Sequence, residues 1–513
     1  INVSSGDGCM MDGVTHEAAS LAGHLKLDNL VVFYDDNEIS IEGSTDLAFT
    51  EDVAKRFAAY EWRVIKVENA NDIEQVNRAL NRAKKSDGRP TLIVGKTVIG
   101  FGAPTKAGTH GCHGEPLGPD ELAAARKGLG FPETDFYVPE DVAAALKRRV
   151  KALGKAAAQW DSQFQAWLEA NKDKAELVSK LLTKNVPADL SEQLLAAAPK
   201  DKPVATRASS GAILQKAAAL VPSLFGGSAD LAPSTKTDIK DAGWFSAENR
   251  AGRNIHFGVR ELAMGCVGNG IATCGTAIPY TSTFFVFSDF MKPAIRLAAL
   301  QQLHEIYVFT HDSFYVGEDG PTHEPIEQLS MLRAIPGLTV IRPAEAIECA
   351  QAWSAAIKAT GPVVLVLTRQ DLRPLSPEQA AKSALDKGGY VVSDDEGAEF
   401  LLIATGSEVN LALDSAAELR KEGKKLRVVS MPSWELFLKQ DKSYQDSVLP
   451  PALKKRVSIE AASTFGWDKF TGDSGLKIGI DHFGASAPYK VLAEKFGFTV
   501  PGVVAKIKAH FSI

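Results

Sequence analysis

Short apolar runs and amphipathic stretches alternate along the first hundred residues of the chain. The apolar runs, rich in β-branched and aromatic residues, predict strands at residues 1–4, 30–34, 63–67 and 91–94. Apolar positions at helical spacing predict helices at residues 16–25, 53–60 and 73–84. A strand, helix, strand order predicts a parallel sheet with right-handed crossovers, because such connections are almost never left-handed.

The same rhythm continues to the end of the chain. Apolar runs predict strands at residues 254–257, 306–310, 338–341 and 363–367, and the stretches at residues 388–392, 400–409, 426–431 and 456–460 indicate another α/β unit. A chain of 513 residues is too long for one hydrophobic core. We therefore predict an α/β protein of three consecutive doubly wound domains, at residues 1–199, 200–382 and 383–513.

Residues 118–200 predict mostly helix. Trp160, Phe164 and Trp167 recur at helical spacing and predict a stripe that faces a core. The polar stretch at residues 185–203, which contains three prolines, predicts an interdomain linker.

Composition and charge describe an ordinary globular protein, 45% apolar and 23% charged. A formal charge of −6 gives no reason to expect nucleic acid or an anionic membrane as a partner. No apolar run reaches the ~18 residues of a membrane span. The five cysteines are scattered without a CxxC pair, which predicts reduced thiols and a cytoplasmic protein. Cys112 lies near two histidines, but an unligated thiol is the simpler interpretation.

Polar residues follow the first two predicted strands. Gly6, Asp7 and Gly8 follow the first strand, and Asn37 and Ile39 follow the second. The carboxyl ends of parallel strands are where open α/β sheets bind ligands. A carboxylate, an amide oxygen and a carbonyl suit Mg²⁺, and glycine lets backbone N–H groups approach a diphosphate. The alternative interpretation is that Gly6, Asp7 and Gly8 form an ordinary turn without a ligand.

Four short motifs lie at predicted strand ends or loops of the second domain, at residues 226–234, 258–265, 310–313 and 317–325. In the second of these, Glu261 opens a helix, and capping the helix N-terminus is the simpler role on sequence alone. On sequence alone, the simplest role of the aromatic residues Phe284, Phe287 and Phe290 is packing in the core. Two histidines, His110 and His113, lie in a Gly-rich loop at residues 100–114, where their imidazoles are suited to proton transfer or anion binding.

These motifs, in this order and spacing, resemble the transketolase family of thiamine diphosphate enzymes. The resemblance covers the whole chain and implies a diphosphate-binding, a pyrimidine-binding and a C-terminal domain. It implies that Asp7, Asn37 and the Ile39 carbonyl bind Mg²⁺, for which Ca²⁺ or Mn²⁺ can substitute, and that Gly6 and Gly8 adjoin the diphosphate. It further implies that Glu261 contacts the aminopyrimidine of thiamine diphosphate and that Phe284, Phe287 and, less firmly, Phe290 stack on it.

The resemblance also implies a substrate site for sugar phosphates. His113 adjoins the diphosphate and the substrate carbonyl, and His110 is a weaker candidate. The phosphate-binding positions are Arg207, Ser234, His311 and Arg369. Asp319 and His323 hold the hydroxyls of the donor, and His323 can pass a proton near neutrality. Glu261, His323 and His113 are thus the candidate catalytic residues.

The implied reaction moves a two-carbon glycolaldehyde unit from a ketose phosphate to an aldose phosphate, as in the pentose phosphate pathway. The implied assembly is a homodimer with shared sites, without nucleic acid or membrane. Family members usually carry about 150 residues before this motif, so we expect a missing N-terminal part. Leu262 and Asp12 depart from the family's usual His and Glu.

Two alternatives stay open: an inactive truncated homologue, and a related thiamine diphosphate enzyme such as deoxyxylulose-phosphate synthase or a dehydrogenase component. The third domain shows no chemistry. Gly406 and Gly484 read as turn glycines, and the domain is expected to buttress the dimer.

Overall fold

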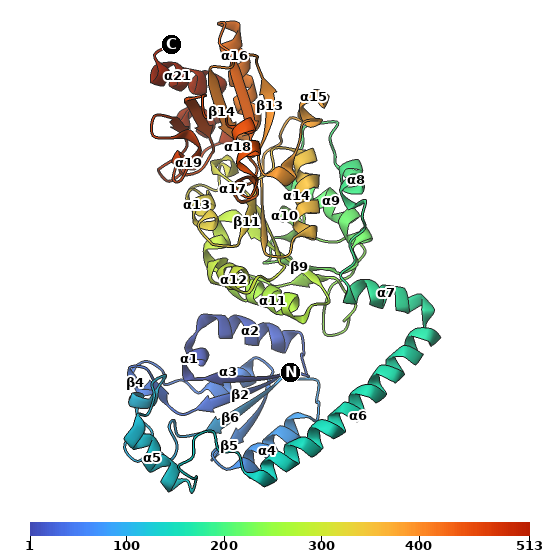
Figure 1. The fold of residues 1–513 in the computed structure, drawn as a ribbon, viewed down its shortest axis with the longest axis vertical. Helices are drawn as coiled ribbons and strands as arrows, with labels where there is room; N and C mark the ends of the chain where they lie inside the picture. Colours follow the sequence, from blue (N-terminus) through green and yellow to red (C-terminus); the bar gives the residue numbers. More distant parts are fainter. The chain divides into compact units, whose positions relative to one another are not determined.

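The structure is a computed structural model that describes residues 1–513 (Figure 1). The chain divides into two compact units. The first comprises Ile1–Ala175 with Ser246–Glu248, and the second comprises Glu176–Phe245 with Asn249–Ile513.

A four-stranded parallel sheet forms the centre of the first unit. Its strands lie in the order β1 (Asn2–Gly6), β2 (Val31–Asp36), β6 (Thr91–Lys96) and β5 (Arg63–Val67). The four strands predicted from the apolar runs are confirmed, as are their parallel directions. Because β1 pairs with β2 so that Gly6 lies opposite Asp35, the polar residues that follow the two strands come to one edge of the sheet.

Helices cover both faces of this sheet (Figure 1). On one face lie α1 (Asp7–Met11), α2 (Gly13–His24) and α3 (Val53–Ala59), around a core that includes Phe57 and Trp62. On the other face α4 (Ile73–Ala83) packs its buried alanines against Ile65 and Ile93. Smaller elements are β3 (Ile39–Ser40), β4 (Gly43–Ser44) and α5 (Pro119–Gly128).

The predicted core-facing stripe on the following helix is wrong. The helix α6 (Glu140–Ala170) is 31 residues long and has no buried residue. Trp160 is 60% exposed and Trp167 40% exposed. Their rings stack on Phe164 between them, with centroids 5.0 and 6.4 Å away. The stripe has the predicted spacing, but its tryptophans are exposed and its rings cover one another. The helix α7 (Lys172–Leu182) follows.

The second unit contains two sheets. The first is a six-stranded parallel sheet in the order β11 (Thr339–Ile341), β12 (Val363–Leu367), β10 (Ile306–Thr310), β9 (Ile278–Phe284), β7 (Leu224–Ser228) and β8 (Asn254–His256). The predicted strands are β8, β10, β11 and β12. The strands β7 and β9 were not predicted. Two adjacent glycines interrupt the apolar pattern of β7, and hydroxyl-bearing residues interrupt that of β9.

Helices pack on both faces of this sheet. One face carries α8 (Leu190–Ala197), α9 (Thr206–Leu220) and α14 (Ala346–Lys358) around one large core. The other carries α11 (Glu261–Cys274) and α12 (Ser288–Gln301). The linker predicted at residues 185–203 is wrong in part, because it contains α8. Leu190 and Leu194 of that helix are fully buried, and this anchors the stretch to the second unit.

The second sheet of this unit has the order β13 (Tyr390–Asp394), β15 (Leu426–Ser430), β14 (Phe400–Ala404), β16 (Lys455–Ile459) and β17 (Leu476–Ile478), with β13 antiparallel. On one face lie α16 (Glu408–Lys421), α20 (Tyr489–Phe496) and α21 (Val500–Phe511). On the other lie α17 (Trp434–Leu438), α18 (Lys442–Val448) and α19 (Asp468–Thr471).

A buried ion network joins the two sheets of the second unit. The Arg342 guanidinium is fully buried and pairs with Asp312 at 2.7 Å and with Glu408. Arg333 donates two hydrogen bonds of 2.8 Å to the Glu460 carboxylate. Because breaking a buried pair leaves an uncompensated charge, these contacts fix one sheet against the other.

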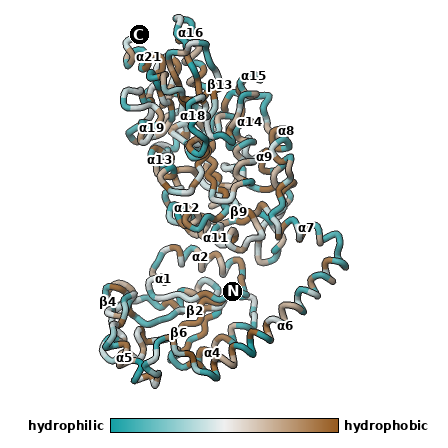
Figure 2. The backbone as a smooth tube through the Cα atoms, viewed as in Figure 1, coloured by the Kyte–Doolittle hydropathy of each residue, from teal (hydrophilic) through white to brown (hydrophobic).

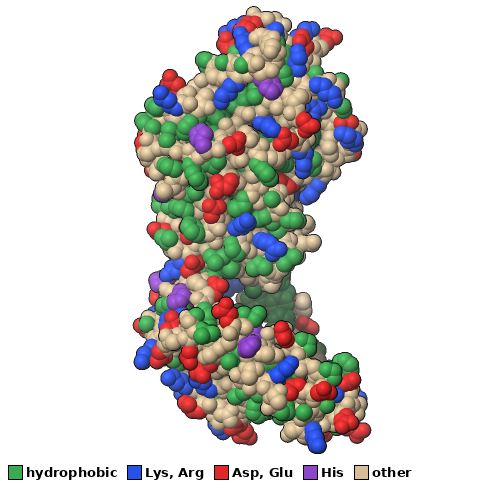
Figure 3. Space-filling model, turned by 90° about the vertical axis from the view of Figure 1, so that its left-hand side faces the viewer, with side chains coloured by type: hydrophobic (Ala, Val, Ile, Leu, Met, Phe, Trp, Pro, Cys, Tyr) green, Lys and Arg blue, Asp and Glu red, His purple; other side chains and the backbone are tan.

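Apolar residues lie mainly along the strands and the inner faces of the helices (Figure 2). The face in Figure 3 shows charged side chains of both signs interspersed with hydrophobic ones. No helix combines the length and the apolar character needed to cross a membrane. All five cysteines are free thiols.

Candidate functional site

The first cluster of candidate residues lies at the carboxyl edge of the first sheet. Asp7 opens α1 directly after β1, and its side chain is only 4% exposed. Tyr34 donates a hydrogen bond of 2.6 Å from its hydroxyl to Asp7 Oδ1, and the Asn37 N–H donates to Oδ2 at 3.4 Å. Ile39 donates its N–H to Asn37 Oδ1 at 3.1 Å. The structure therefore brings Asp7, Asn37 and Ile39 together, as the strand register predicts.

The surroundings of Asp7 are acidic. A hollow of about 390 Å³ is lined by Asp7, Asp36, Glu38, Asp46, Glu51, Asp52 and Glu68, against only Lys66 and Lys96. Burial raises the pKa of the Asp7 carboxyl, Tyr34 lowers it by hydrogen bonding, and the nearby Asp36 raises it again. The Lys96 Nζ atom forms ion pairs with the carboxylates of Asp36, at 3.0 Å, and Glu38, at 2.5 Å. Asp7 itself makes no ion pair in this chain.

The donor set at Asp7 fits a hard divalent cation. A buried carboxylate without a cationic partner is costly, and a carboxylate, an amide oxygen and a carbonyl are the ligands that Mg²⁺ prefers. In the absence of a cation this acidic hollow would repel a diphosphate. A metal ion at Asp7 would reverse the sign of the local charge.

The second cluster lies at the carboxyl edge of the six-stranded sheet. Glu261 is the first residue of α11 and is 9% exposed, so the predicted helix start is confirmed. The helix α11 packs against β9, whose last residue is Phe284. Phe284 and Phe287 lie nearly parallel, with ring centroids 6.2 Å apart. Phe290 is 61% exposed and continues the stack at 6.0 Å from Phe287. The predicted core packing of this stripe therefore holds for Phe284 alone.

Basic and hydroxyl groups meet beside these rings. Arg207, near the start of α9, donates from Nη1 to the Ser234 carbonyl at 2.9 Å and to Ser234 Oγ at 3.1 Å. The same nitrogen donates to His311 Nε2 at 3.4 Å. Arg369 lies near enough to lower the pKa of Arg207, although burial lowers it more. Arg207, Ser234, His311 and Arg369, which are far apart in sequence, thus form one cluster of basic and hydroxyl groups, which we call the basic cradle.

His311 is neutral in this cradle. Burial lowers its pKa to about 3, and the charges of Arg207 and Arg369 and the nearby His323 act in the same direction. Because Nε2 accepts from Arg207, Nδ1 carries the proton and donates to Thr310 Oγ1 at 2.8 Å. The residue has a positive φ of 63° directly after β10. Such strain is uncommon outside glycine and occurs often at functional sites.

The motif at residues 317–325 lies next to the aromatic rings. The His323 ring is edge-on to Phe287 at 5.5 Å and to Phe284 at 6.4 Å. Its Nδ1 lies 2.9 Å from Thr322 Oγ1. Asp319 is exposed in the same loop. The second unit thus places Glu261, His323, the aromatic rings and the basic cradle at one sheet edge.

The histidine loop belongs to the first unit. His110 is exposed, and His113 is half-buried with its Nδ1 buried and without a hydrogen-bond partner. Cys112 donates from Sγ to the carbonyls of Lys106 and Thr109, both at 3.3 Å, which agrees with an ordinary thiol. Whether His113 approaches the substrate stays a prediction.

Two residues at these clusters were missed by sequence reasoning. Tyr34, which holds Asp7, looks in the sequence like the last apolar residue of a strand. Glu324, which follows His323, is 2% exposed, and no side chain donates a hydrogen bond to its carboxyl oxygens. The only signal in the sequence for Glu324 was its place in the motif at residues 317–325.

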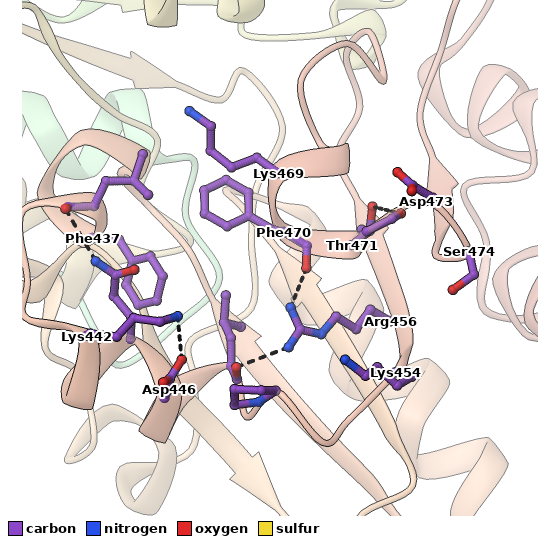
Figure 4. Close-up of a pocket in the computed structure, with 15 residues that line it drawn as sticks. Phe437, Lys442, Asp446, Lys454, Arg456, Lys469, Phe470, Thr471, Asp473 and Ser474 are labelled. Atoms are coloured by element: carbon purple, nitrogen blue, oxygen red, sulfur yellow. Dashed lines mark hydrogen bonds and ion pairs between the residues drawn. The ribbon is translucent and has the colours of Figure 1, made fainter.

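A separate hollow of about 520 Å³ lies in the C-terminal sheet region, away from these clusters (Figure 4). The Arg456 guanidinium in this hollow already donates hydrogen bonds to the backbone carbonyls of Phe470, at 2.7 Å, and Pro450, at 2.8 Å. Lys442 pairs with Asp446 at 2.7 Å. Lys454, Lys469 and Asp473 also line this hollow.

Three family profiles match successive parts of the chain. They are the transketolase thiamine diphosphate binding domain at residues 1–187, the transketolase pyrimidine binding domain at residues 202–374 and the transketolase-like C-terminal domain at residues 388–499.

Curated relatives agree with these profiles. A transketolase of Geobacillus stearothermophilus is 49% identical over 510 residues, and one of Bacillus subtilis (strain 168) is 48% identical over 510 residues. In both cases the alignment covers 98% of this chain and 76% of the relative. These comparisons do not establish the expected loss of residues before Ile1.

Solved structures agree as well. A transketolase from Leishmania mexicana is 39% identical with a TM-score of 0.94, covering 100% of this chain and 75% of that one. A Pichia stipitis transketolase in complex with sedoheptulose-7-phosphate is 40% identical with a TM-score of 0.95, covering 100% of this chain and 76% of that one.

Proposed function

This chain belongs to the transketolase family of enzymes, and from that premise we propose the reaction that it catalyses and the role of each cluster. The proposed reaction is the transfer of a two-carbon glycolaldehyde unit from a ketose phosphate to an aldose phosphate, as in the pentose phosphate pathway. The observation that carries this proposal is the basic cradle, where Arg207 reaches both Ser234 and His311 beside the aromatic rings. A planar guanidinium with several donors suits a phosphate group.

The proposed cofactors are thiamine diphosphate and Mg²⁺. Asp7, Asn37 and the Ile39 carbonyl would hold the metal, with Gly6 and Gly8 next to the diphosphate. Glu261, Phe284 and Phe287 would hold the pyrimidine, with Phe290 at the outer end of the stack. When bound, thiamine diphosphate supplies the nucleophilic carbon and the electron sink for carbon–carbon bond cleavage.

The side chains of this chain bind, orient and move protons. Glu261, buried at the helix N-terminus, would hold a proton against a ring nitrogen of the cofactor. His323 and His113 would exchange protons with the substrate hydroxyl and carbonyl groups, and Asp319 would bind a donor hydroxyl. The phosphate would lie among Arg207, Ser234, His311 and Arg369, with the two guanidinium groups and the Ser234 hydroxyl as its donors.

We further propose a homodimer with shared sites. The proposal rests on the family resemblance, which implies that each site lies between two subunits, with the diphosphate on one chain and the pyrimidine on its partner. A cytoplasmic location and the absence of nucleic acid and membrane partners remain predictions, supported by the free thiols and the moderate negative charge.

The test replaces Glu261 by Ala and measures transfer from xylulose 5-phosphate to an aldose phosphate, with thiamine diphosphate and Mg²⁺ present. We expect transfer to fall by about 100-fold or more, the usual contribution of a general acid or base. The control is Glu378→Ala, since Glu378 is an exposed acid in the first turn of α15 (Pro377–Ala380). If Glu261→Ala transfers glycolaldehyde as well as the unmodified chain, the proposal fails. Turnover of pyruvate in place of the ketose phosphate would favour the related thiamine diphosphate enzymes.

A further inference from the structure

A buried carboxyl lies in the loop that carries Asp319 and His323. Glu324 is 2% exposed, and no side chain donates a hydrogen bond to its carboxyl oxygens. Burial raises the pKa of this carboxyl to about 7. The backbone N–H groups of Ala485 and Gly317 lower the pKa by hydrogen bonding, and Asp319 raises it. Because a carboxyl is costly to bury, its position calls for an explanation beyond packing.

The carboxyl is covered by a segment more than 150 residues further on, at residues 484–489 of the C-terminal region. A Cβ atom at Gly484 would lie 1.6 Å from Glu324 Oε2 and 2.7 Å from its Cδ, so only glycine admits the carboxyl here. Gly484 has no positive φ. Its predicted role as a turn glycine is therefore wrong, and the close approach of Glu324 is the reason for glycine. By contrast, Gly406 has a φ of 54°, as a turn glycine should.

The same two segments meet at further points. Ser486 donates from Oγ to the Glu318 carbonyl at 2.6 Å. A Cβ at Gly320 would lie 3.1 Å from Ser486 Cβ, and a Cβ at Gly317 would lie 3.3 Å from the Tyr489 nitrogen. The 317–325 loop therefore rests along residues 484–489, with Glu324 inserted over Gly484. We call this contact the loop catch.

We propose that the loop catch positions Asp319 and His323 for the donor sugar, so that the C-terminal domain takes part in substrate binding through Glu324, Gly484 and Ser486. Glu324 is here a positioning residue, because the structure shows it inserted between the loop and the C-terminal segment. The inference about sugar binding rests on the proposed function, whereas the catch itself can be tested without turnover.

The first experiment measures backbone amide hydrogen exchange in the full chain and in Gly484→Ala. The added Cβ displaces the Glu324 carboxyl and should release the loop. We expect exchange of residues 317–325 to rise by about 10-fold, with exchange of the β10 and β14 amides unchanged. Gly361→Ala is the matched control, because a Cβ there meets only the Gly337 carbonyl, at 3.9 Å. Unchanged exchange of the loop in Gly484→Ala would overturn the catch.

The second experiment measures the KM for the ketose phosphate, kcat and the affinity for thiamine diphosphate in the holoenzyme. In Gly484→Ala we expect KM to rise by about 10-fold, since small misplacements of binding groups are expensive, with cofactor affinity unchanged. Ser486→Ala, which removes one hydrogen bond without a clash, should raise KM in the same direction by a smaller factor. An unchanged KM alongside faster loop exchange would overturn the positioning role. No turnover by the unmodified chain would instead count against the proposed function.

The double variant Glu324→Ala with Gly484→Ala separates a specific contact from general damage. Removing the carboxyl makes room for the new Cβ, so the double variant should have the KM of Glu324→Ala alone. Glu324→Gln keeps the size and hydrogen-bonding capacity of the side chain and should restore KM to within about twofold of the unmodified chain. Effects of Glu324→Ala and Gly484→Ala that multiply in the double variant would contradict the catch.

Discussion

The acidic cluster around Asp7 and the basic cradle around Arg207 are built from buried or half-buried polar groups of opposite sign. Asp7 has a hydroxyl and an N–H as partners and acidic neighbours along its hollow. Arg207 has a carbonyl, a hydroxyl and a neutral imidazole as partners, with Arg369 nearby. Both clusters lie at the carboxyl edges of parallel sheets, where side chains of consecutive strands converge.

The difference between the clusters shows what each one lacks. Burial raises the pKa of Asp7 and lowers the pKa of Arg207 and His311, so in each case the charged form is disfavoured. A cation would relieve the first cluster and an anion the second. A divalent metal beside a diphosphate and a sugar phosphate are ligands with these signs, and the predictions below test the two clusters separately.

The largest effect is expected from Asp7→Asn. The amide keeps the shape but loses the charge, so binding of Mg²⁺ with thiamine diphosphate should weaken by more than about 100-fold. Calorimetric titration measures this. In the absence of ligands the variant should melt no lower than the unmodified chain, because a disfavoured buried charge has gone.

Tyr34→Phe is the control for that variant, since it removes the hydrogen bond to Asp7 but keeps the carboxylate. It should weaken metal binding by only about 10-fold. Metal affinity in Asp7→Asn equal to that of the unmodified chain would show that the acidic hollow does not bind the metal.

A smaller effect is expected from Arg207→Lys. Lysine keeps the charge but cannot reach Ser234 and a phosphate oxygen together, so KM for a ketose phosphate should rise by about 10- to 100-fold. KM for the corresponding ketose without phosphate should change little. Steady-state kinetics with both donors measures the contrast.

The matched control is Arg253→Lys. Arg253 is also partly buried but donates only to backbone carbonyls, of Leu224, Ala218 and Val221. Its replacement should lower the melting temperature and leave the ratio of the two KM values unchanged. If Arg207→Lys affects both donors equally, the basic cradle does not select phosphate.

The last effect involves no ligand and concerns the pH dependence of stability at His311. Its pKa is about 3 in the folded chain, against 6.5 ordinarily, so between these values the unfolded chain holds a proton that the folded chain lacks. The free energy of unfolding should therefore fall as the pH drops from 6.5 toward 3, by about 1.4 kcal/mol per pH unit from this group. His311→Gln should remove that part of the slope.

Melting temperatures of both proteins across this pH range measure the difference, with exposed His24→Gln as control. Inorganic phosphate should reduce the slope of the unmodified chain, because an anion in the cradle favours the imidazolium. Parallel curves for His311→Gln and the unmodified chain would mean that His311 is not the neutral, desolvated group described here.

Local patterns in the sequence predicted much of the fold. The predicted strands were found because strands buried on both faces give continuous apolar runs, as in β10 and β12. The strand β7 was missed because two glycines interrupt its pattern. The helix α8 was assigned to an interdomain linker because prolines flank it, although Leu190 and Leu194 are fully buried.

Some candidate site residues could be placed from the sequence, and others could not. Asp7 with Asn37, and Glu261 at a helix start, could be placed from strand and helix boundaries alone. That Arg207, Ser234 and His311 lie within hydrogen-bonding distance could not, because they are separated along the chain by up to 104 residues. The stripe on α6 shows the opposite failure, since its spacing is that of a buried face and its rings are exposed.

The sequence by itself determined the order of strands and helices, the family and the residue types available at each strand end, because these depend on short-range pattern and motif. Tertiary structure alone decided which side chains share a site and which charges are desolvated. It also decided that Gly484 is glycine to admit the Glu324 carboxyl. The physical reason is that burial and close approach depend on segments distant in the chain, which no local pattern contains.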